Sequence, residues 1–406
     1  MASTSGVEIA APSPAGDCKR DVFSWSGREE RVSLATAAQF AASLRRVTLT
    51  NLVRIGLLGC GRVSRRYLEV FRDELNDIAK VVAVADPVAD RTESFARELG
   101  ADVVQGIEGI AAARPNLVCV LTESGNHGKH ALALLEQGVN VVVEKPVTLL
   151  PAEGERLAEQ ARKRGLICAV VKQNRYNPAM RFLRQAVDTG RLGRLVTAGV
   201  RVHWCREQGY YDDPWHGRWA MDGGVLAQQA IHHLDALQWL AGPVDAVCAH
   251  GEAVLNRLEA EDTAVAAVRF ASGALGTIEA TTSARPRDFE ASLHLVGEKA
   301  LAKVGGQALN RIETWSPVTP TPDDARVAEL HSQDVPTSYG LGHGPYLRAV
   351  IEAFRAGRTD VPVDAGEGLR ALRFVHALYA SMERGGWVRL SDQPESRRLG
   401  RGPLPS

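Results

Sequence analysis

Residues 52–66 read LVRIGLLGCGRVSRR, and this stretch decides the fold. Its apolar first half is typical of a strand, and the charged segment that starts at Arg62 is typical of a helix. Between them, Gly59, Gly61 and Ser64 form a G-x-G-x-x-S turn, with Ser where a third Gly or Ala usually stands. Small residues there let the backbone approach a pyrophosphate at the start of a helix. Alone, such a turn is weak evidence, but its place between a strand and a helix makes it strong.

An acidic residue ends the next apolar run. Asp86 follows VVAVA and lies 25 residues after Gly61, slightly beyond the usual spacing of about 20. Its carboxylate would accept hydrogen bonds from the adenosine ribose hydroxyls and would repel a 2′-phosphate. We therefore predict NAD as the cofactor, in preference to NADP. The alternative interpretation is a structural turn followed by a capping aspartate.

Strand-like and helix-like segments alternate from Leu52 to Lys172. Continuous runs rich in valine, such as residues 116–122 and 139–146, predict strands that are buried on both faces. Helical segments between such strands imply right-handed crossovers and a parallel sheet. We therefore predict an α/β protein whose residues 51–172 form a doubly wound Rossmann domain.

The pattern changes after Lys172. Longer strand-like segments follow, and FASGALGTI at residues 270–278 predicts a hairpin because Ser-Gly separates its two halves. Helices are expected at residues 225–242, 345–357 and 367–384. Residues 173–390 are thus predicted to form an α/β domain with a large open, mainly antiparallel sheet. The polar residues 391–406 are expected to be a loose tail.

Composition and termini exclude several classes of protein. Lys plus Arg and Asp plus Glu number 48 each, so no net charge attracts nucleic acid or an anionic membrane. No apolar run approaches the roughly 20 residues that span a bilayer, and we expect the N-terminal residues not to be a secretory signal because they lack an apolar core segment. The six scattered cysteines form no CxxC pair, so we expect a cytoplasmic protein without disulfides or a metal site. Residues 1–50 are expected to be a mobile extension, with a short helix at 34–46 as the alternative.

Two clusters carry the chemistry. Lys145, in Glu144-Lys145-Pro146, ends a predicted parallel strand, and such strand ends face the ligand crevice. On the helix expected at residues 225–242, spacings of i, i+4 and i+7 would place Gln228, His232 and Asp235 on one face. Histidine is a natural general base near neutral pH. The alternatives are a surface lysine and a structural histidine.

Taken in order, these motifs resemble the glucose–fructose oxidoreductase / inositol dehydrogenase / MocA family. The resemblance runs from residue 53 to about 385 and includes TESGNH at residues 122–127. It implies a sugar-oxidising enzyme in which Lys145 and His232 lie near the nicotinamide and are catalytic. The residues implied to bind the cofactor are Gly59, Gly61, Arg62, Val63, Asp86, Thr122, His127, Glu144 and Lys145.

Other segments resemble the subgroup that oxidises the 3-hydroxyl of UDP-N-acetylglucosamine or its uronic acid. These segments are KQNRYNP from Lys172, the polar-aromatic residues 204–219, and the Gln-x-x-Ile-His-His-x-Asp run. The residues that would bind the substrate are Asn174, Arg175, Arg206, Tyr211, Gln228 and His232. Two positions depart from the wider family: Gln228 stands where many members have Asp, and Glu123 where Pro is usual, which questions the local loop shape.

Three functions follow from these observations. The first is oxidation of a nucleotide-sugar hydroxyl with NAD, and the second is oxidation of a cyclitol or free sugar on the same fold. The third is an NAD-binding regulator without catalysis, because a fold alone does not settle function. The expected partners are a small sugar or nucleotide sugar and further copies of the chain. We expect a homodimer or homotetramer, because apolar strands such as TAVAAVRF have no later helices obviously available to cover them.

Overall fold

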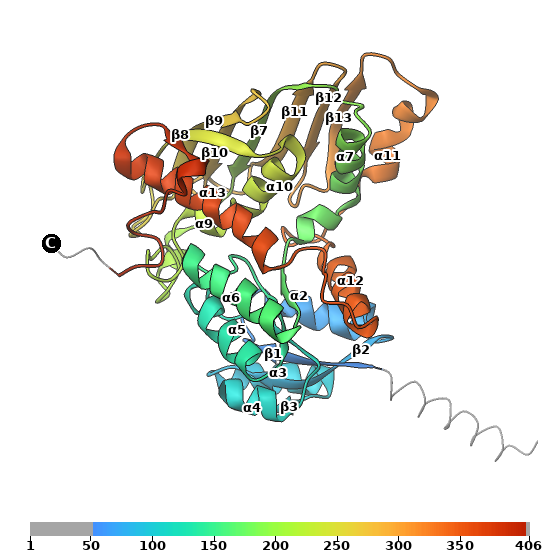
Figure 1. Cartoon of the computed structure of the whole chain (residues 1–406), viewed down its shortest axis with the longest axis vertical. Helices are drawn as coiled ribbons and strands as arrows, with labels where there is room; N and C mark the ends of the chain where they lie inside the picture. Colours follow the sequence, from blue (N-terminus) through green and yellow to red (C-terminus); the bar gives the residue numbers. More distant parts are fainter. Residues whose placement is uncertain (1–51, 403–406) are drawn as a thin grey trace, which may run out of the picture. The chain divides into compact units, whose positions relative to one another are not determined.

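The computed structural model describes residues 52–402 (Figure 1). The mobile extension and the helix at residues 34–46 that the sequence suggested lie outside the described residues. None of the helices within residues 52–402 combines the length and the apolar character needed to cross a membrane. The five cysteines in this range carry free thiols.

The first sheet has six strands in the order β3-β2-β1-β4-β5-β6, and every neighbouring pair is parallel. Its central strands are almost wholly buried, as the continuous apolar runs predicted. The predicted Rossmann-type sheet is confirmed. The strands are β1 Val53–Leu58, β2 Ala79–Ala85, β3 Asp102–Val103, β4 Leu117–Val120, β5 Asn140–Val143 and β6 Cys168–Val170.

The chain changes direction in this sheet between β1 and β4. From β1 it runs outward through β2 and β3, and then returns to β4 on the other side of β1. In open parallel sheets the ligand crevice lies at such a switch point, beyond the carboxyl ends of the strands. The helices of this domain are α2 Ser64–Glu69 with a π-helical continuation over Val70–Glu74, α3 Ala89–Leu99, α4 Gly106–Ala112, α5 His127–Glu136 and α6 Pro151–Arg164.

The second sheet has eight strands in the order β13-β12-β11-β7-β10-β9-β8-β14. Only the pairing of β7 with β10 is parallel. The prediction of a mainly antiparallel sheet is confirmed, and so is the β9–β10 hairpin at Ser272-Gly273. The strands are β7 Leu195–His203, β8 Val244–Glu252, β9 Thr263–Phe270, β10 Leu275–Thr281, β11 Glu290–Gly297, β12 Ala300–Gly305, β13 Arg311–Pro317 and β14 Val388–Arg389.

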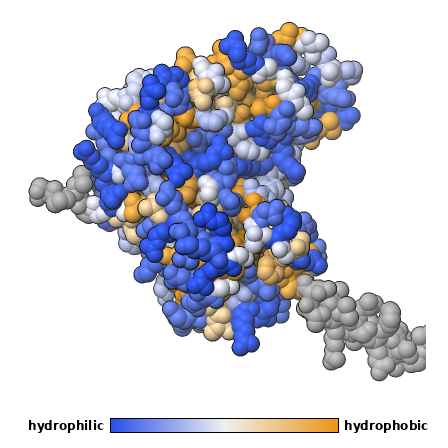
Figure 2. All heavy atoms as spheres, viewed as in Figure 1, coloured by the Kyte–Doolittle hydropathy of each residue, from blue (hydrophilic) through white to orange (hydrophobic). Residues whose placement is uncertain are grey.

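Helices cover one face of this second sheet. The helices α7 Pro178–Asp188, α10 Ile231–Ala241 and α13 Ala365–Arg384 pack against its strands. The expectation that no later helix is available was therefore wrong for this face. The opposite face exposes apolar side chains, with Val265 52%, Leu275 61% and Leu301 45% exposed. Figure 2, viewed with these helices in front as in Figure 1, shows a mostly hydrophilic surface, with hydrophobic side chains visible where Figure 1 labels β11 and β12.

The helix predicted at residues 225–242 is interrupted. It forms α9 Val225–Gln228 and α10 Ile231–Ala241, with a turn at Gln229 and Ala230 between them. Gln228 therefore ends one short helix, while His232 and Asp235 lie on the next. The remaining helices are α8 Gln208–Tyr211, α11 Val327–His331 and α12 His343–Arg355.

The C-terminal segment up to residue 402 is packed rather than loose. Leu399 is fully buried, and Ser396 donates its backbone N–H to His376 and its hydroxyl to Glu383, both on α13. The backbone N–H of Gly400 donates to the carbonyl of Trp219. A segment of polar composition can dock in this way because one apolar residue fills a core position while neighbouring helices satisfy its polar groups.

Candidate active site

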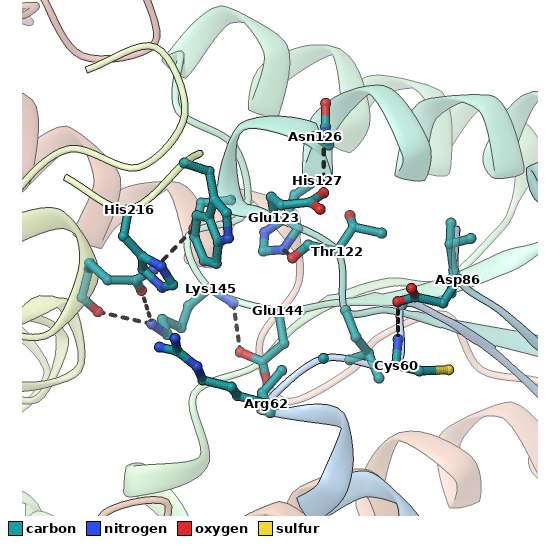
Figure 3. A pocket seen from close by; sticks show the side chains of 18 of the residues that line it. Cys60, Arg62, Asp86, Thr122, Glu123, Asn126, His127, Glu144, Lys145 and His216 are labelled. Carbon is teal, nitrogen blue, oxygen red and sulfur yellow. Dashed lines mark hydrogen bonds between the residues drawn. The ribbon is translucent and has the colours of Figure 1, made fainter. Parts of the chain in front are cut away.

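A cavity of about 1180 Å³ lies at the carboxyl ends of the parallel strands. The Rossmann domain contributes the glycine turn, Asp86, residues 121–127 and the Glu144-Lys145 pair to its lining. The second domain contributes Gln228, His232 and the segment around Trp204–His216. Figure 3 labels His216 of this segment together with residues of the Rossmann domain. The volume exceeds the roughly 300–1,000 Å³ of ordinary small-molecule pockets, which leaves room for a dinucleotide and a second ligand.

The glycine turn is shaped by close backbone contacts. Gly59 has φ +103°, and a Cβ there would lie 2.6 Å from the carbonyl oxygen of Leu121. Ser64, which stands where a third glycine is usual, donates its hydroxyl to the carbonyl of Gly59 at 2.8 Å. A Cβ on Gly61 would meet no atom within 4 Å. The turn thus presents bare backbone to the cavity, as a pyrophosphate requires, and the residues present fit a dinucleotide.

Asp86 is held in place by two backbone amides. Its carboxylate accepts hydrogen bonds from the N–H of Cys60 at 2.8 Å and of Val88 at 2.9 Å. The side chain lines the cavity beside the turn, where the adenosine ribose of a dinucleotide lies in this fold. Arg91 lies 4.0 Å from this carboxylate but is mostly exposed, so the ion pair between them neutralises little of its charge.

We expect NAD to bind at least tenfold more tightly than NADP, a difference of about 1.4 kcal/mol. The fixed Asp86 carboxylate cannot turn away from a 2′-phosphate. Calorimetric titration of both dinucleotides checks this. Asp86→Ser should reduce the preference for NAD over NADP. Asp90→Ser, on the exposed side of α3, should leave this preference unchanged. Equal affinity of the unaltered chain for both dinucleotides would defeat this role of Asp86.

Lys145 reaches across the cavity to the second domain. Its Nζ donates to the backbone carbonyl of Gln228 at 2.9 Å and to Oε1 of the same residue. An ammonium has three N–H bonds, so one remains for a ligand. Burial lowers the pKa of Lys145, and the negative charges of Glu144 and Asp222 counteract it in part. The Lys145 ammonium is thus held in a fixed direction, and it releases a proton more readily than an exposed lysine does.

Glu144 anchors the backbone of this lysine. Its carboxylate accepts hydrogen bonds from the backbone N–H of Lys145 at 3.0 Å and from the Tyr67 hydroxyl at 2.9 Å, and His343 lies 3.5 Å away. Burial raises the pKa of Glu144, but the contacts with His343 and Lys145 outweigh burial and lower it overall. The carboxylate of Glu144 is therefore ionised and lies next to the backbone of Lys145.

A buried carboxyl group lies behind Gln228. Asp222 accepts hydrogen bonds from the Gln228 side-chain amide at 2.6 Å, from the Ser124 hydroxyl at 3.2 Å and from the N–H of Gly217 at 3.2 Å. Burial raises the pKa of Asp222 to about 7. These contacts fix the amide of Gln228 with its oxygen towards Lys145. Sequence reasoning missed Asp222, although it lies only three residues before the helix predicted at residues 225–242.

His232 lines the same cavity as Lys145. Its Nε2 lies 3.3 Å from the side-chain amide nitrogen of Gln173, and its Nδ1 has no hydrogen-bond partner among residues 52–402. Burial lowers the pKa of His232 well below its usual range, and the charges of Lys145 and Lys172 lower it further. At neutral pH the imidazole is uncharged and can accept a proton.

Other predicted cofactor residues also line the cavity. Thr122 and Val63 do so, and the ring nitrogens of His127 face the carbonyls of Pro146 at 2.7 Å and of Thr122 at 2.9 Å. His127 therefore joins the loop at Thr122 to the turn at Pro146. Glu123 has φ −66°, a value that proline also adopts, so the loop keeps an extended shape despite this departure from the family.

Several predicted substrate residues do not line the cavity. Arg175 donates to Asp235 at 2.7 and 2.8 Å and to Glu367 at 2.8 Å, so its charge is already paired. Asp235, which also contacts Lys172, belongs to this buried network and not to the cavity face. Asn174 is buried away from the cavity, and the Tyr211 hydroxyl bonds Thr282 at 2.6 Å. Periodicity alone could not show these pairings.

The polar-aromatic insert does form a cavity wall. Trp204, Arg206, Tyr210, Trp215 and His216 line it, so Tyr210 takes the place that Tyr211 was expected to hold. Arg62, a predicted cofactor residue, also lines the cavity and lies 4.8 Å from the Tyr210 ring and 3.9 Å from Asp213. The signal for this wall was the unusual density of aromatic and charged residues after Trp204.

The fold and the site define an NAD-dependent dehydrogenase with a lysine and a histidine in one cavity. Residues 53–172 match the family described as "Oxidoreductase family, NAD-binding Rossmann fold", and residues 184–390 match "Oxidoreductase family, C-terminal alpha/beta domain". The chain belongs to the glucose–fructose oxidoreductase / inositol dehydrogenase / MocA family and is an NAD-dependent sugar or cyclitol dehydrogenase of that family. The resemblance inferred from the motifs is confirmed.

Three relatives illustrate the range of this family. The WlbA dehydrogenase from Bordetella pertussis, solved in complex with NADH and UDP-GlcNAcA, is 34% identical with a TM-score of 0.79 over 84% of this chain and 98% of that one. The scyllo-inositol 2-dehydrogenase (NAD(+)) of Bacillus subtilis is 27% identical over 63% of this chain and 75% of its own. The D-glucoside 3-dehydrogenase of Escherichia coli is 25% identical over 83% of this chain and 97% of its own.

Proposed function

We propose that the chain oxidises the 3-hydroxyl of a UDP-N-acetylhexosamine or its uronate to a ketone, at the expense of NAD. The observation that carries this proposal is the aromatic wall, with Arg206 and Arg62, that continues the Lys145–His232 cavity. The likeness to the WlbA dehydrogenase, solved with UDP-GlcNAcA, supports a ligand of the same class. A free cyclitol would leave much of this wall without a contact.

Arg206 is the candidate for the negative charge of such a ligand. Its guanidinium lies 5.2 Å from the Trp204 ring and 5.9 Å from the Tyr210 ring. Its Nη1 contacts Asp288 and the carbonyl of Cys205, whereas Nε and Nη2 have no hydrogen-bond partner among residues 52–402. Arginine is suited to bidentate contacts with phosphate or carboxylate oxygens. Arg206 would hold the diphosphate or the uronate group.

The reaction needs a base and a donor at one oxygen. Lys145 donates a hydrogen bond to the substrate hydroxyl and stabilises negative charge as it develops there. His232, neutral and facing the same cavity, accepts the hydroxyl proton. The nicotinamide, when bound, supplies the acceptor for the hydride that leaves the same carbon. Gln228 transfers no proton, and its carbonyl and amide oxygens orient Lys145. The reverse assignment, with Lys145 as base, is the alternative.

A second candidate function is oxidation of a cyclitol or a free glucoside. The B. subtilis and E. coli relatives carry such names. A purely regulatory NAD-binding role fits poorly, because Lys145 and His232 share one cavity and the charge of Lys145 acts on the His232 imidazole.

A substrate panel separates these functions. UDP-N-acetylglucosamine, its uronate, inositols and methyl glucosides are each incubated with the protein and NAD, and NADH is followed by absorbance. We expect turnover with a UDP-sugar at a kcat/KM at least a hundredfold above that of any cyclitol or glucoside. The reverse order would favour the second candidate, and no turnover with any of them would favour the regulatory role.

We further propose that the chain forms a homodimer or homotetramer through the open face of the eight-stranded sheet. Val265, Leu275 and Leu301 are exposed there, beside the ion pair of Arg201 with Glu279. Apolar exposure over a flat sheet favours association with a second copy. Light scattering at micromolar concentration should give at least twice the chain mass. Leu275→Glu should weaken the assembly and Leu330→Glu, on α11, should not; a monomeric unaltered chain would refute the proposal.

A further inference from the structure

Besides His232, the imidazole of His216 lines the cavity, and it plays no part in the mechanism above. His216 follows α8 on the polar-aromatic insert, and its Nδ1 is hydrogen-bonded to the carboxylate of Asp213. The other oxygen of Asp213 accepts from the backbone N–H groups of Trp215 at 3.1 Å and of His216 at 2.9 Å. Three contacts within four residues therefore fix the carboxylate that orients this ring.

The ring itself packs against two aromatic side chains. Its centroid lies 3.6 Å from that of Trp215, with 29° between the planes, and 4.1 Å from that of Tyr210. Only 5% of His216 is exposed, yet it lines the cavity. Since Nδ1 is bound to Asp213, Nε2 is the nitrogen left for a ligand. Figure 3 shows the ring beside the end of Lys145, whose charge acts on it.

The surrounding charges determine which nitrogen carries the proton. Burial raises the pKa of Asp213, but the two backbone amides and His216 outweigh it and lower the pKa overall, so the carboxylate is ionised. Burial lowers the pKa of His216 to about 4 against the opposing effect of Asp213, and the charges of Arg62 and Lys145 lower it further. At neutral pH the single ring proton sits on Nδ1, towards Asp213. Nε2 then presents a lone pair to the cavity.

We propose that His216 is a specificity-determining residue whose Nε2 accepts a hydrogen bond from the ring hydroxyl next to the one that is oxidised. The oxidised hydroxyl already has a donor in Lys145 and an acceptor in His232, so a further acceptor beside Lys145 serves a neighbouring hydroxyl. A rigid, neutral acceptor of this kind selects polyhydroxylated rings, because an unfilled buried acceptor costs binding energy. The inference rests on the proposal that the cavity binds a sugar ring.

Two variants test this role. His216→Phe keeps a ring against Trp215 and Tyr210 and removes Nε2. Asp213→Asn offers an amide N–H to Nδ1, which moves the ring proton to Nε2 and turns the acceptor into a donor. Each should raise KM about tenfold with the unmodified substrate and change kcat less than about threefold. His331→Phe on α11, a histidine that stacks on Phe182 outside the cavity, is the matched control and should leave both constants unchanged.

The decisive comparison uses whichever substrate the panel identifies and its analogue with hydrogen in place of that neighbouring hydroxyl, which for a UDP-hexosamine is the 4-deoxy compound. With the analogue, the KM of the unaltered chain should rise about tenfold. The KM of His216→Phe should not rise further, since coupled contacts are not additive. Calorimetric binding to the NADH complex should repeat the pattern.

The inference would be overturned if the deoxy analogue raised KM equally in the unaltered chain and in His216→Phe. It would also be overturned if both variants kept the KM of the unaltered chain for the unmodified substrate. A fall in kcat of a hundredfold or more at constant KM would also overturn it, in favour of His216 as the base. If the panel selects a cyclitol, the proposed nucleotide-sugar function fails, while the deoxy comparison remains a valid test of His216.

Discussion

Replacing Lys145 by methionine should lower kcat by about 10²–10⁴-fold while NADH remains bound. Methionine keeps most of the length of the side chain but removes the charge and every N–H that the hydroxyl oxygen and Gln228 would receive. Loss of a donor aimed at developing negative charge, or of an acid–base group, has effects of this size. Stopped-flow measurement of hydride transfer gives the rate, and fluorescence titration gives NADH affinity.

Lys163, on the exposed surface of α6, provides the matched control. Its ammonium pairs with Glu159 at 2.7 Å and is well outside the cavity, so Lys163→Met should retain full turnover. A Lys145→Met protein that keeps more than a tenth of the normal rate would show that the hydroxyl is activated by another group.

His232→Ala should likewise lower kcat by about 10²–10⁴-fold, whereas His233→Ala should cost much less activity. The two side chains point about 100° apart around α10. His232 lines the cavity, while His233 is buried against Trp204 with ring centroids 5.7 Å apart. Removing His233 leaves a small void, so its main effect should be a lower melting temperature.

Steady-state kinetics at saturating NAD, together with thermal melting of both variants, distinguish these effects. An inactive His233→Ala protein beside an active His232→Ala protein would mean that the catalytic face of α10 is the other one. Recovery of part of the His232→Ala rate by added imidazole would support loss of a base rather than loss of structure.

The Rossmann domain could be predicted from the sequence because its signals are local. The run at residues 52–66 joins a strand, a glycine turn and a helix within a short segment, and Asp86 ends the next strand. The parallel order of strands then follows from general rules of connection. Lys145 and His232 could be placed for the same reason, since each lies directly in a short motif at the end or start of an element.

The substrate side was harder to predict because pairings between distant residues decide it. Arg175 looked like a free cation in the sequence, but Asp235 and Glu367 bind it. Gln228 and His232 line the cavity from either side of the turn at Gln229 and Ala230. Asp235, further along α10, is paired with Arg175 instead. Asp222 and His216 act through loop contacts that no periodicity reports. Whether Tyr210 or Tyr211 lines the cavity depends on how the short helix α8 is rotated about its own axis.

The most direct test of the proposed function follows a deuterium atom at C3 of the sugar. UDP-N-acetylglucosaminuronate and UDP-N-acetylglucosamine, each carrying deuterium at C3, are incubated with the protein and NAD, and both products are analysed by mass spectrometry. If the proposed function is correct, deuterium appears in NADH, and one of the sugars becomes a ketone that has lost its C3 label. If neither UDP-sugar transfers deuterium while an inositol or a glucoside reduces NAD, the proposed substrate is contradicted.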